Sequence, residues 1–393
     1  MINPQRSVMI LGAAFRRRGG FPFGLYERDR LLHTYIIGQT GTGKSTLLGN
    51  MIHEDLKAHR GLCLIDPHGD LAEALAPLLG DDDVFWDAAD PNSPYGYNPL
   101  TRASDAHRPL IASGLIDALK KQWADAWGVR MEHLLRYAIL ALLEQPSADL
   151  TQIVRLYIDR NFRQSIVDRV RDPQVLHFWR VEFPSMNFKT AADGVAPIAN
   201  KLGALLAHPI VRQALCQPRQ PLRFRRLMDQ GRKIIVNLAK GRIGSDTADV
   251  LGGLVIASLF NAALSRHDAA EQTRRPFFLY VDEFHSFTTL AFAGLLSEVR
   301  KYGIGAVLAH QYTAQTEPHI EQAILGNAGS LIAFRTSAAD AAIMAKELSQ
   351  EQPDNLVTLG NFEAICRIMV DGERTRSFTM HTYPSSLPGI PKV

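Results

Sequence analysis

The chain has 393 residues, 46% of them hydrophobic, so it can bury a large core and form two or three domains, or one large domain with an insertion. Its formal net charge of +3 neither indicates nor excludes a nucleic-acid partner, because a balanced total can hide a basic channel. The three cysteines, Cys63, Cys216 and Cys366, are far apart and form no CxxC pair, so composition indicates neither a disulfide framework nor a zinc site, and we expect a cytoplasmic protein.

Residues 1–104 are expected to fold as an α/β unit. Apolar runs bounded by turn residues predict its strands, which are 8–11, 35–37, 61–66 and 84–87. Residues 15–23 are basic and rich in glycine, so we predict a loop there. The segment 61–66 is apolar throughout, as expected for a central strand of a parallel sheet.

A phosphate-binding loop follows the second of these strands. Residues 38–45, GQTGTGKS, match the pattern G-x-x-x-x-G-K-[ST], whose glycines let backbone N–H groups turn toward phosphate oxygens. Lys44 is expected to reach the β- and γ-phosphates, and the Ser45 hydroxyl to hold Mg²⁺. A helix opens at this point and presents its N-terminus to the same anion. The residues predicted to bind the nucleotide are Gly38, Gln39, Thr40, Gly41, Thr42, Gly43, Lys44, Ser45 and Thr46.

A polar cluster, DPHGD, ends the strand 61–66. Its residues, Asp66 to Asp70, follow the carboxyl end of a predicted parallel strand, which is the ligand-binding side of such a sheet. The same residues also suit an ordinary turn in which an aspartate caps the helix 71–79. The sequence leaves both interpretations open.

Residues 105–214 are predicted to form an all-helical insertion domain. Apolar residues recur there at helical spacing, and strand-like runs are absent. The predicted helices are 111–127, 130–144, 150–158, 162–170 and 191–207. The α/β domain would then consist of residues 1–104 and 215–393.

The α/β pattern returns from residue 222. The predicted strands are 233–238, 276–281, 305–311 and 330–335, and the predicted helices are 249–265, 290–302 and 338–348. Two further segments, 362–370 and 375–383, are expected to form a hairpin through the turn pair Asp371-Gly372. The fold class is therefore α/β, with a mostly parallel central sheet.

No segment is expected to cross a membrane. The longest apolar run, near residues 252–264, is interrupted by Ser258 and Asn261 and is shorter than the ~20 residues that a span needs. The apolar run 8–15 is followed by arginines, whereas a signal peptide has its basic residues first.

Two carboxylates at the end of the strand 276–281 suit a nucleotide hydrolase. The apolar run FFLYV delivers Asp282 and Glu283, which is the form of a Walker B element. We expect Asp282 to join the Mg²⁺ shell and Glu283 to orient or deprotonate the attacking water. The second carboxylate favours hydrolysis, because a kinase uses an acceptor hydroxyl of its substrate instead of water.

Three more residues are candidates for sensing or stabilising the γ-phosphate. Gln311 ends the strand that follows the Walker B element, so its amide should lie on the same sheet edge as Lys44, either as a γ-phosphate sensor or as a simple buried polar residue. Arg300 and Arg335 are candidates for an arginine finger, which neutralises transition-state charge and is often supplied by a neighbouring subunit.

Taken together, these motifs resemble the HerA–FtsK branch of P-loop motor ATPases, and within it the conjugative coupling proteins of type IV secretion (TraD/TraG type). The likeness extends over most of the chain. It rests on DRLLH (29–33) before the phosphate loop, IDPHGD (65–70), NPL (98–100), NKL (200–202), the segment 237–244, YVDEF (280–284), LSEVRKYG (296–303) and HQ (310–311).

The resemblance implies a RecA-like motor domain with an all-α insertion, acting as a homo-hexameric ring that uses ATP and Mg²⁺ to move DNA through its centre. Arg300 falls where this family places its trans-acting arginine, so it ranks above Arg335. The resemblance also implies a relaxase or a membrane secretion channel as a partner, with peripheral recruitment to the inner membrane.

DNA contacts would come from basic clusters, which bind phosphates in a salt-dependent and sequence-independent way. The best candidates are Lys240 and Arg242, because their loop follows a sheet strand near the nucleotide edge. The other clusters are Arg16–Arg18, Lys120-Lys121, Arg223 with Arg225 and Arg226, and Arg274-Arg275.

Two classes of function fit these features. The first is an ATP-driven DNA translocase in conjugation or type IV secretion, with protein-unfolding or pilus-assembly motors as near relatives. The second is an ATP-dependent switch or assembly scaffold that recruits a partner through its helical domain. A complete set of Lys44, Ser45, Asp282, Glu283 and Gln311 favours turnover over a passive switch.

Overall fold

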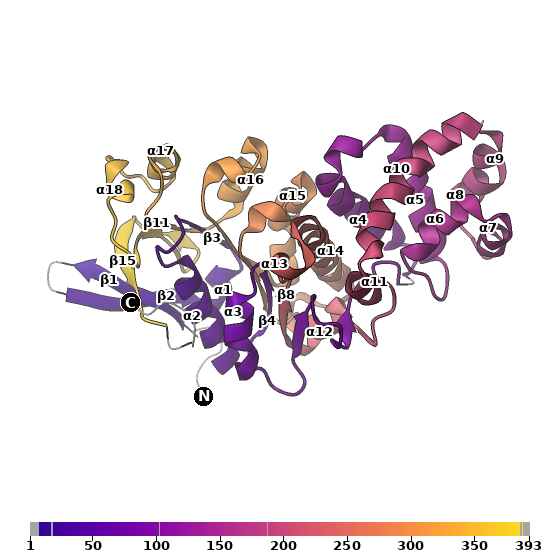
Figure 1. Ribbon diagram of the computed structural model, residues 1–393. Coiled ribbons are helices and arrows are strands. Elements are labelled where there is room, and N and C mark those ends of the chain that lie inside the picture. Colours follow the sequence, from indigo (N-terminus) through magenta and orange to yellow (C-terminus); the bar gives the residue numbers. More distant parts are fainter. Residues whose placement is uncertain (1–7, 17–18, 102, 187, 386, 388–393) are drawn as a thin grey trace. The chain divides into compact units, whose positions relative to one another are not determined.

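The structure, a computed structural model, describes residues 8–16, 19–101, 103–186, 188–385 and 387 (Figure 1). Its internal contacts divide the chain into two compact units. The sheet unit comprises residues 1–85, 225–239 and 262–393, and the helical unit comprises residues 86–224 and 240–261. The domain boundaries predicted after residues 104 and 214 stay a prediction.

A mostly parallel sheet of eleven strands forms the centre of the fold, in the order β2-β1-β15-β12-β11-β3-β10-β9-β4-β8-β5. Its six central strands run parallel, and most of their residues are fully buried, which explains why they read as unbroken apolar runs. They are β3 (Thr34–Ile37), β4 (Gly61–Asp66), β8 (Lys233–Asn237), β9 (Phe277–Val281), β10 (Ile304–His310) and β11 (Ser330–Phe334). The predicted α/β class with a mostly parallel sheet is confirmed.

An antiparallel extension continues the sheet beyond β11. It consists of β12 (Glu363–Arg367), β15 (Phe378–Thr382), β1 (Val8–Arg16) and β2 (Gly19–Tyr26), and β5 (Val84–Asp87) ends the sheet at the other edge. The predicted turn Asp371-Gly372 joins the short strands β13 (Met369–Val370) and β14 (Glu373–Arg374), and both turn residues have positive φ, 53° and 82°. The Asp29 carboxylate accepts the backbone N–H groups of these two residues at 2.8 and 2.9 Å.

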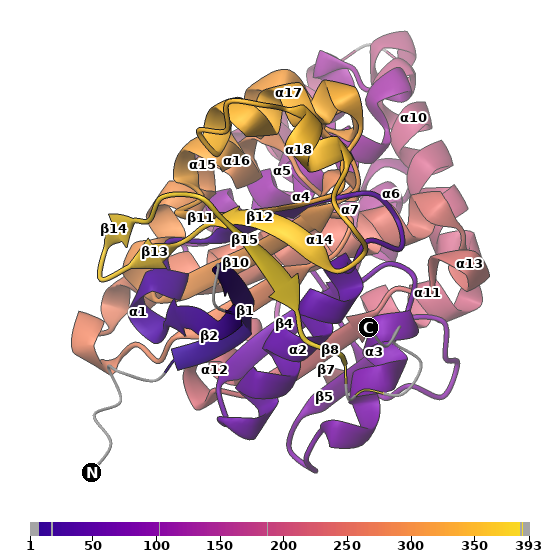
Figure 2. The same cartoon turned by 90° about the vertical axis from the view of Figure 1, so that its left-hand side faces the viewer.

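Helices cover both faces of the sheet (Figure 2). Helices α2 (Lys44–Lys57) and α3 (Asp70–Leu75) lie on one face, and α15 (Leu290–Val299), α16 (Pro318–Asn327) and α17 (Ala338–Glu347) lie on the other. The shorter helices α1 (Glu27–Arg30), α12 (Phe224–Gln230) and α18 (Asp354–Val357) connect these elements.

The helical unit packs its helices around aromatic side chains. Its helices are α4 (Arg108–Gln122), α5 (Val129–Leu143), α6 (Thr151–Ile158), α7 (Arg160–Val167), α8 (Pro173–His177), α9 (Phe183–Ser185), α10 (Phe188–Ala207), α11 (Pro209–Cys216) and α13 (Lys240–Ile243). Tyr137 on α5 stacks on Phe178 with ring centroids 4.2 Å apart. Two-residue strands, β6 (Tyr95–Gly96) and β7 (Gln220–Pro221), pair within the same unit.

The predicted loop over residues 15–23 is wrong. Its described residues, 15–16 and 19–23, belong to β1 and β2, which pair residue 8 with 26 and residue 16 with 19. The glycines of the predicted loop are Gly19, which has a φ of 114° at the start of β2, and Gly20, where an added Cβ would lie 3.2 Å from the Ala13 Cβ on β1. Two glycines just outside this segment mark a closer approach between strands. A Cβ on Gly24 would lie 1.9 Å from the Met9 carbonyl oxygen, and a Cβ on Gly12 would lie 2.3 Å from that of His381.

One helix has the length and hydropathy of a membrane-spanning segment. The segment 245–268, which contains α14 (Ser245–Leu264), is long and apolar enough to cross a membrane by length and composition, with a mean hydropathy of 1.6. However, 67% of that apolar window is buried inside the protein, as in the core helix of a globular domain. This helix is therefore weak support for a membrane span.

A buried ion pair ties the P-loop helix to the sheet. Arg30 donates to both carboxylate oxygens of Asp55 on α2 at 2.7 and 2.6 Å, and the Tyr280 hydroxyl on β9 donates to the same carboxylate at 2.6 Å. Asp55 is 0% exposed. Removing one member of such a pair leaves the other charge buried without compensation.

We therefore expect Asp55→Ala to lower the free energy of unfolding by about 3–5 kcal/mol. Urea unfolding of the variant and the wild type measures this difference. Glu54→Ala is the matched control, since Glu54 is the neighbouring residue and pairs with Lys57 at the surface, where an ion pair contributes about 0–1 kcal/mol. Equal losses in the two variants would contradict a special role for the buried pair.

Candidate nucleotide-binding and hydrolysis site

The phosphate loop connects β3 to α2 at the carboxyl edge of the sheet. Gly41 and Gly43 have φ values of 76° and 122°, a backbone region that side chains with a Cβ rarely adopt. A Cβ on Gly38 would lie 2.6 Å from the Cβ of Phe334, so only glycine fits there. The loop and the start of α2 open onto a cavity of 410 Å³, lined by Thr40, Gly41, Gly43, Lys44, Ser45, Thr46, Asp66, His68, Asp70, Leu71, Asp282, Glu283, Gln311 and Phe362.

The Lys44 side chain folds back over this loop. Its Nζ donates to the carbonyl oxygens of Gly38 and Gln39 at 2.5 and 3.2 Å. Burial lowers the pKa of this ammonium, and the carboxylates of Asp282 and Glu283 partly offset the effect. A phosphate group would supply the counter-charge that this buried cation lacks.

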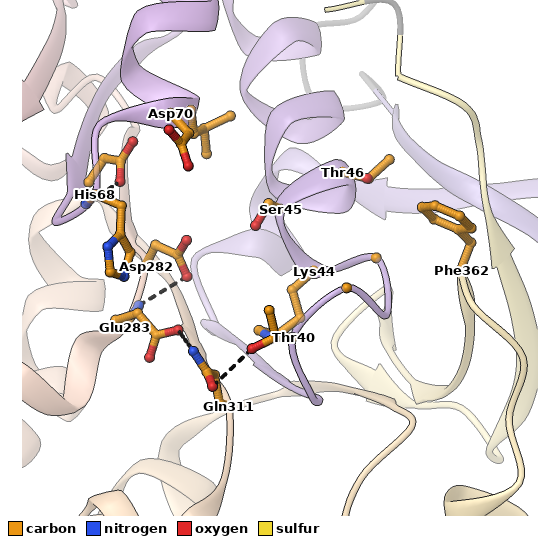
Figure 3. Close-up of a pocket in the computed structure, with 14 residues that line it drawn as sticks. Thr40, Lys44, Ser45, Thr46, His68, Asp70, Asp282, Glu283, Gln311 and Phe362 are labelled. Atoms are coloured by element: carbon orange, nitrogen blue, oxygen red, sulfur yellow. Dashed lines mark hydrogen bonds between the residues drawn. The ribbon is translucent and has the colours of Figure 1, made fainter. Parts of the chain in front are cut away.

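Asp282 follows β9 and lies across the cavity from Ser45 (Figure 3). Burial raises the pKa of its carboxyl group to about 7, with further contributions from the carboxylates of Asp66 and Glu283 and an opposing one from Lys44. Three acidic groups so close together favour a bound cation, and an oxygen-rich donor set of hydroxyl and carboxylate suits Mg²⁺. The hydroxyl of Ser45 and the carboxylate of Asp282, the predicted metal ligands, are therefore a donor set that suits Mg²⁺.

Glu283 is linked to the phosphate loop through Gln311. The Gln311 Nε2 donates to the Glu283 Oε1 at 2.8 Å, and the Thr40 hydroxyl donates to the Gln311 Oε1 at 3.1 Å (Figure 3). Glu283 has a left-handed backbone, with φ 48°, which is uncommon for a residue other than glycine. Its side chain lines the cavity.

The polar cluster after β4 combines both functions that its sequence allowed. Asp66 accepts the N–H groups of His68 and Ala72 at 3.0 and 2.9 Å, so it caps the start of α3. At the same time, Asp66, His68 and Asp70 all line the nucleotide cavity.

Sequence reasoning missed two residues of this site. His285 lies with its Nδ1 3.3 Å from the Glu283 Oε2, and Phe362 lines the cavity from the far end of the chain. The position of His285, two residues after Glu283, was a signal that could have been used. Nothing in the local sequence around Phe362 pointed to the phosphate loop.

The two candidate arginine fingers lie at opposite edges of the sheet. Arg300 is exposed in the turn before β10, whereas Gln311 follows the last residue of β10. A strand of this length spans about 20 Å, so the Arg300 side chain cannot reach the cavity of its own chain. Arg335 directly follows β11, beside the phosphate loop, where its carbonyl oxygen accepts the Gln39 N–H at 2.9 Å. Its side chain donates to the Leu359 carbonyl oxygen at 3.2 Å and the Asn361 Oδ1 at 2.9 Å.

Four of the candidate DNA-binding residues form ion pairs within their own unit. In the helical unit, Lys240 pairs with Asp249 at 3.4 Å, and Arg242 with Asp87 at 2.9 Å. These two residues lie on α13, where a loop had been expected. Arg225 and Lys120 also pair with acidic residues, and Arg274 donates to backbone carbonyls. The side chains of Arg16–Arg18 lie outside the described residues.

Part of this chain is similar to a known protein family. Residues 27–167 match the family model described as "Helicase HerA, central domain". This match covers a little over a third of the chain and includes the phosphate loop. The resemblance inferred from the motifs is therefore confirmed, while a search of curated proteins found no similar sequence.

Solved structures confirm the RecA-like fold of this chain. The bacterial conjugative coupling protein TrwBdeltaN70 has a TM-score of 0.66 at 16% identity, covering 98% of this chain and 90% of that one. TrwB with the ATP analogue ADPNP has a TM-score of 0.65 at 17% identity, covering 98% and 91%. VirB4 of Thermoanaerobacter pseudethanolicus has a TM-score of 0.66 at 16% identity, covering 97% of each chain.

Lys44→Ala is expected to abolish nucleotide binding, because it removes the cation that faces the phosphates. A bound nucleotide at a hundredfold excess over its Kd stabilises a protein by about 2.7 kcal/mol, so the wild type should melt at a higher temperature with ATP and Mg²⁺ and the variant should not. Lys57→Ala, at the other end of α2, is the control and should retain the full shift. A normal shift in Lys44→Ala would show that phosphates bind elsewhere.

Proposed function

We propose that this HerA/FtsK-type NTPase is an ATP-driven DNA translocase, of the kind that acts in conjugation or type IV secretion. The observation that carries the hydrolytic part is the chain of contacts from Thr40 through Gln311 to Glu283. It joins the phosphate loop to the candidate base, so a γ-phosphate in the loop can change the position of the base. A protein that only binds nucleotide has no use for such a link.

ATP and Mg²⁺ are the proposed cofactors. Lys44 and the N-terminus of α2 would hold the phosphates, and Ser45 and Asp282 would hold the metal, which neutralises charge on the β- and γ-phosphates when bound. Glu283 would take the proton of the attacking water. TrwB, which has the same fold, has been solved with ADP and Mg²⁺ and with an ATP analogue.

A ring of identical subunits is the proposed assembly. Arg300 is exposed and about 20 Å from its own cavity along β10, so it can serve catalysis only in a neighbouring subunit. This supports a homo-oligomer, which we take to be a hexamer by family resemblance. The proposed partners are DNA and a relaxase or membrane secretion channel, and the proposed location is the cytoplasm with peripheral recruitment to the inner membrane.

One observation favours the alternative of an ATP-dependent switch or scaffold. Lys240 and Arg242, the strongest candidates for DNA contact, are already paired with Asp249 and Asp87. Binding of DNA there would have to displace these carboxylates. A switch would use the helical unit to recruit a protein partner and would not need DNA.

DNA-stimulated ATP hydrolysis separates the two functions. The ATPase rate is measured without DNA and with single- or double-stranded DNA, at low and moderate salt because phosphate contacts weaken steeply with salt. The translocase is expected to hydrolyse ATP faster with at least one form of DNA. A rate that neither form raises would overturn the translocase and leave the switch.

A further inference from the structure

The nucleotide cavity has an aromatic wall on the side away from the carboxylates. Figure 3 shows the ring of Phe362 beyond Thr46, with the phosphate loop between it and Asp282 and Glu283. The ring is half-buried and lines the cavity. It is the single phenyl ring among the described residues that line this cavity, where the other ring is the imidazole of His68.

The topology of the sheet explains why Phe362 reaches this place. The strands that carry Glu283 and Gln311, β9 and β10, lie on one side of β3, while β11 and β12 lie on the other. Because β12 runs antiparallel to β11, its first residues lie at the same edge as the phosphate loop. Phe362 directly precedes β12, so it flanks the loop on the side opposite the catalytic carboxylates.

Backbone hydrogen bonds hold Phe362 in an unusual conformation. Its N–H donates to the Thr42 carbonyl oxygen in the phosphate loop at 2.7 Å, and its carbonyl oxygen accepts from the Thr382 N–H at 2.9 Å. The φ of Phe362 is 65°, a region that a bulky side chain rarely adopts unless its surroundings impose it. A Cβ on Gly43 would lie 3.1 Å from the Phe362 Cδ1, so the ring packs against the loop itself.

The preceding turn is braced as well. Arg335 donates to the Leu359 carbonyl oxygen and to the Asn361 side chain, and its own carbonyl oxygen accepts the Gln39 N–H at 2.9 Å. The turn that carries Phe362 is therefore fastened to the phosphate loop at two points, Thr42 and Gln39. A residue needed only for core packing would not require a strained backbone at the rim of a cavity.

We propose that the Phe362 ring is the stacking platform for the nucleobase of the bound nucleotide. This rests on the proposed ATP binding. With the γ-phosphate near Glu283 and Gln311, the phosphate chain runs past Ser45 and Thr46, which brings the nucleoside to Phe362. A phenyl ring offers a π-face to any base and reads no hydrogen-bonding edge, so ATP and GTP are both accepted.

Binding measurements with three ligands test this assignment. Isothermal titration gives the Kd of ATP, GTP and tripolyphosphate, each with Mg²⁺, for the wild type, Phe362→Ala and Phe362→Trp. Stacking on an aromatic ring corresponds to a loss of roughly 5- to 150-fold in affinity on alanine substitution, so Phe362→Ala should bind ATP and GTP at least fivefold more weakly. Tripolyphosphate, which has no base, should bind equally well, and Phe362→Trp should retain nucleotide affinity.

The control is Phe21→Ala, which removes a phenyl ring that is 53% exposed on β2 and lies outside the cavity. It should leave all three affinities unchanged. Unchanged ATP affinity in Phe362→Ala would overturn the proposal, and so would an equal loss for ATP and tripolyphosphate, which would mean that the residue only shapes the phosphate loop. These binding measurements contain no DNA. They therefore test the role of Phe362 even if the protein proves not to be a DNA translocase.

Discussion

Glu283→Gln is expected to bind ATP as the wild type does and to hydrolyse it roughly 10²- to 10⁴-fold more slowly, the range that general-base catalysis contributes. The glutamine keeps the size of the side chain and an oxygen that can accept the Gln311 hydrogen bond of 2.8 Å. It cannot take a proton from water. Binding and turnover are therefore expected to separate in this variant.

Two measurements check this separation. Titration with a fluorescent ATP analogue gives the affinity, and phosphate release gives the turnover rate with and without DNA. Glu298→Gln is the matched control, because Glu298 is exposed on α15 and pairs with Lys301 at the surface. Normal hydrolysis by Glu283→Gln would show that Glu283 is not the base and that the Thr40–Gln311–Glu283 chain has another purpose.

The parts of this site that could be predicted are those whose functional residues lie close together in the sequence. Residues 38–46 and the pair Asp282-Glu283 each lie in one short stretch, and the parallel order of β3, β9 and β10 places their ends together. Gln311 was predictable in the same way. It directly follows β10, and the residue after a parallel strand lies at the carboxyl end of the sheet, where the phosphate loop also lies.

The parts that could not be predicted depend on contacts between distant stretches. Phe362 reaches the loop only because β12 joins the sheet antiparallel, and no periodicity in the sequence encodes that pairing. The β1–β2 hairpin was missed because the basic residues and the glycines Gly19 and Gly20 where its two strands meet are equally typical of a loop. The ion pairs Arg242–Asp87 and Lys240–Asp249 could not be predicted either, because the two partners of each pair lie in different segments of the chain.

Arg300→Ala is expected to reduce ATP hydrolysis by roughly 10³-fold or more, the size of effect that an arginine finger provides. The protein should still bind ATP, because the side chain lies at the opposite edge of the sheet from the cavity. The decisive measurement uses mixed assemblies. A subunit with Arg300→Ala has an intact site, and a subunit with Glu283→Gln has an intact Arg300, so an interface between them contains one complete site.

Mixing these two inactive variants should therefore restore a fraction of the wild-type rate, and that rate should fall on dilution as the assembly dissociates. Lys301→Ala is the control, since it removes the adjacent exposed cation and should remain active on its own. Arg335→Ala distinguishes the other candidate, because Arg335 lies beside the phosphate loop of its own chain and a defect there would not be rescued by a neighbour. Full hydrolysis by a dilute monomer would contradict the assignment of Arg300, since a single chain cannot bring that side chain to its own phosphates.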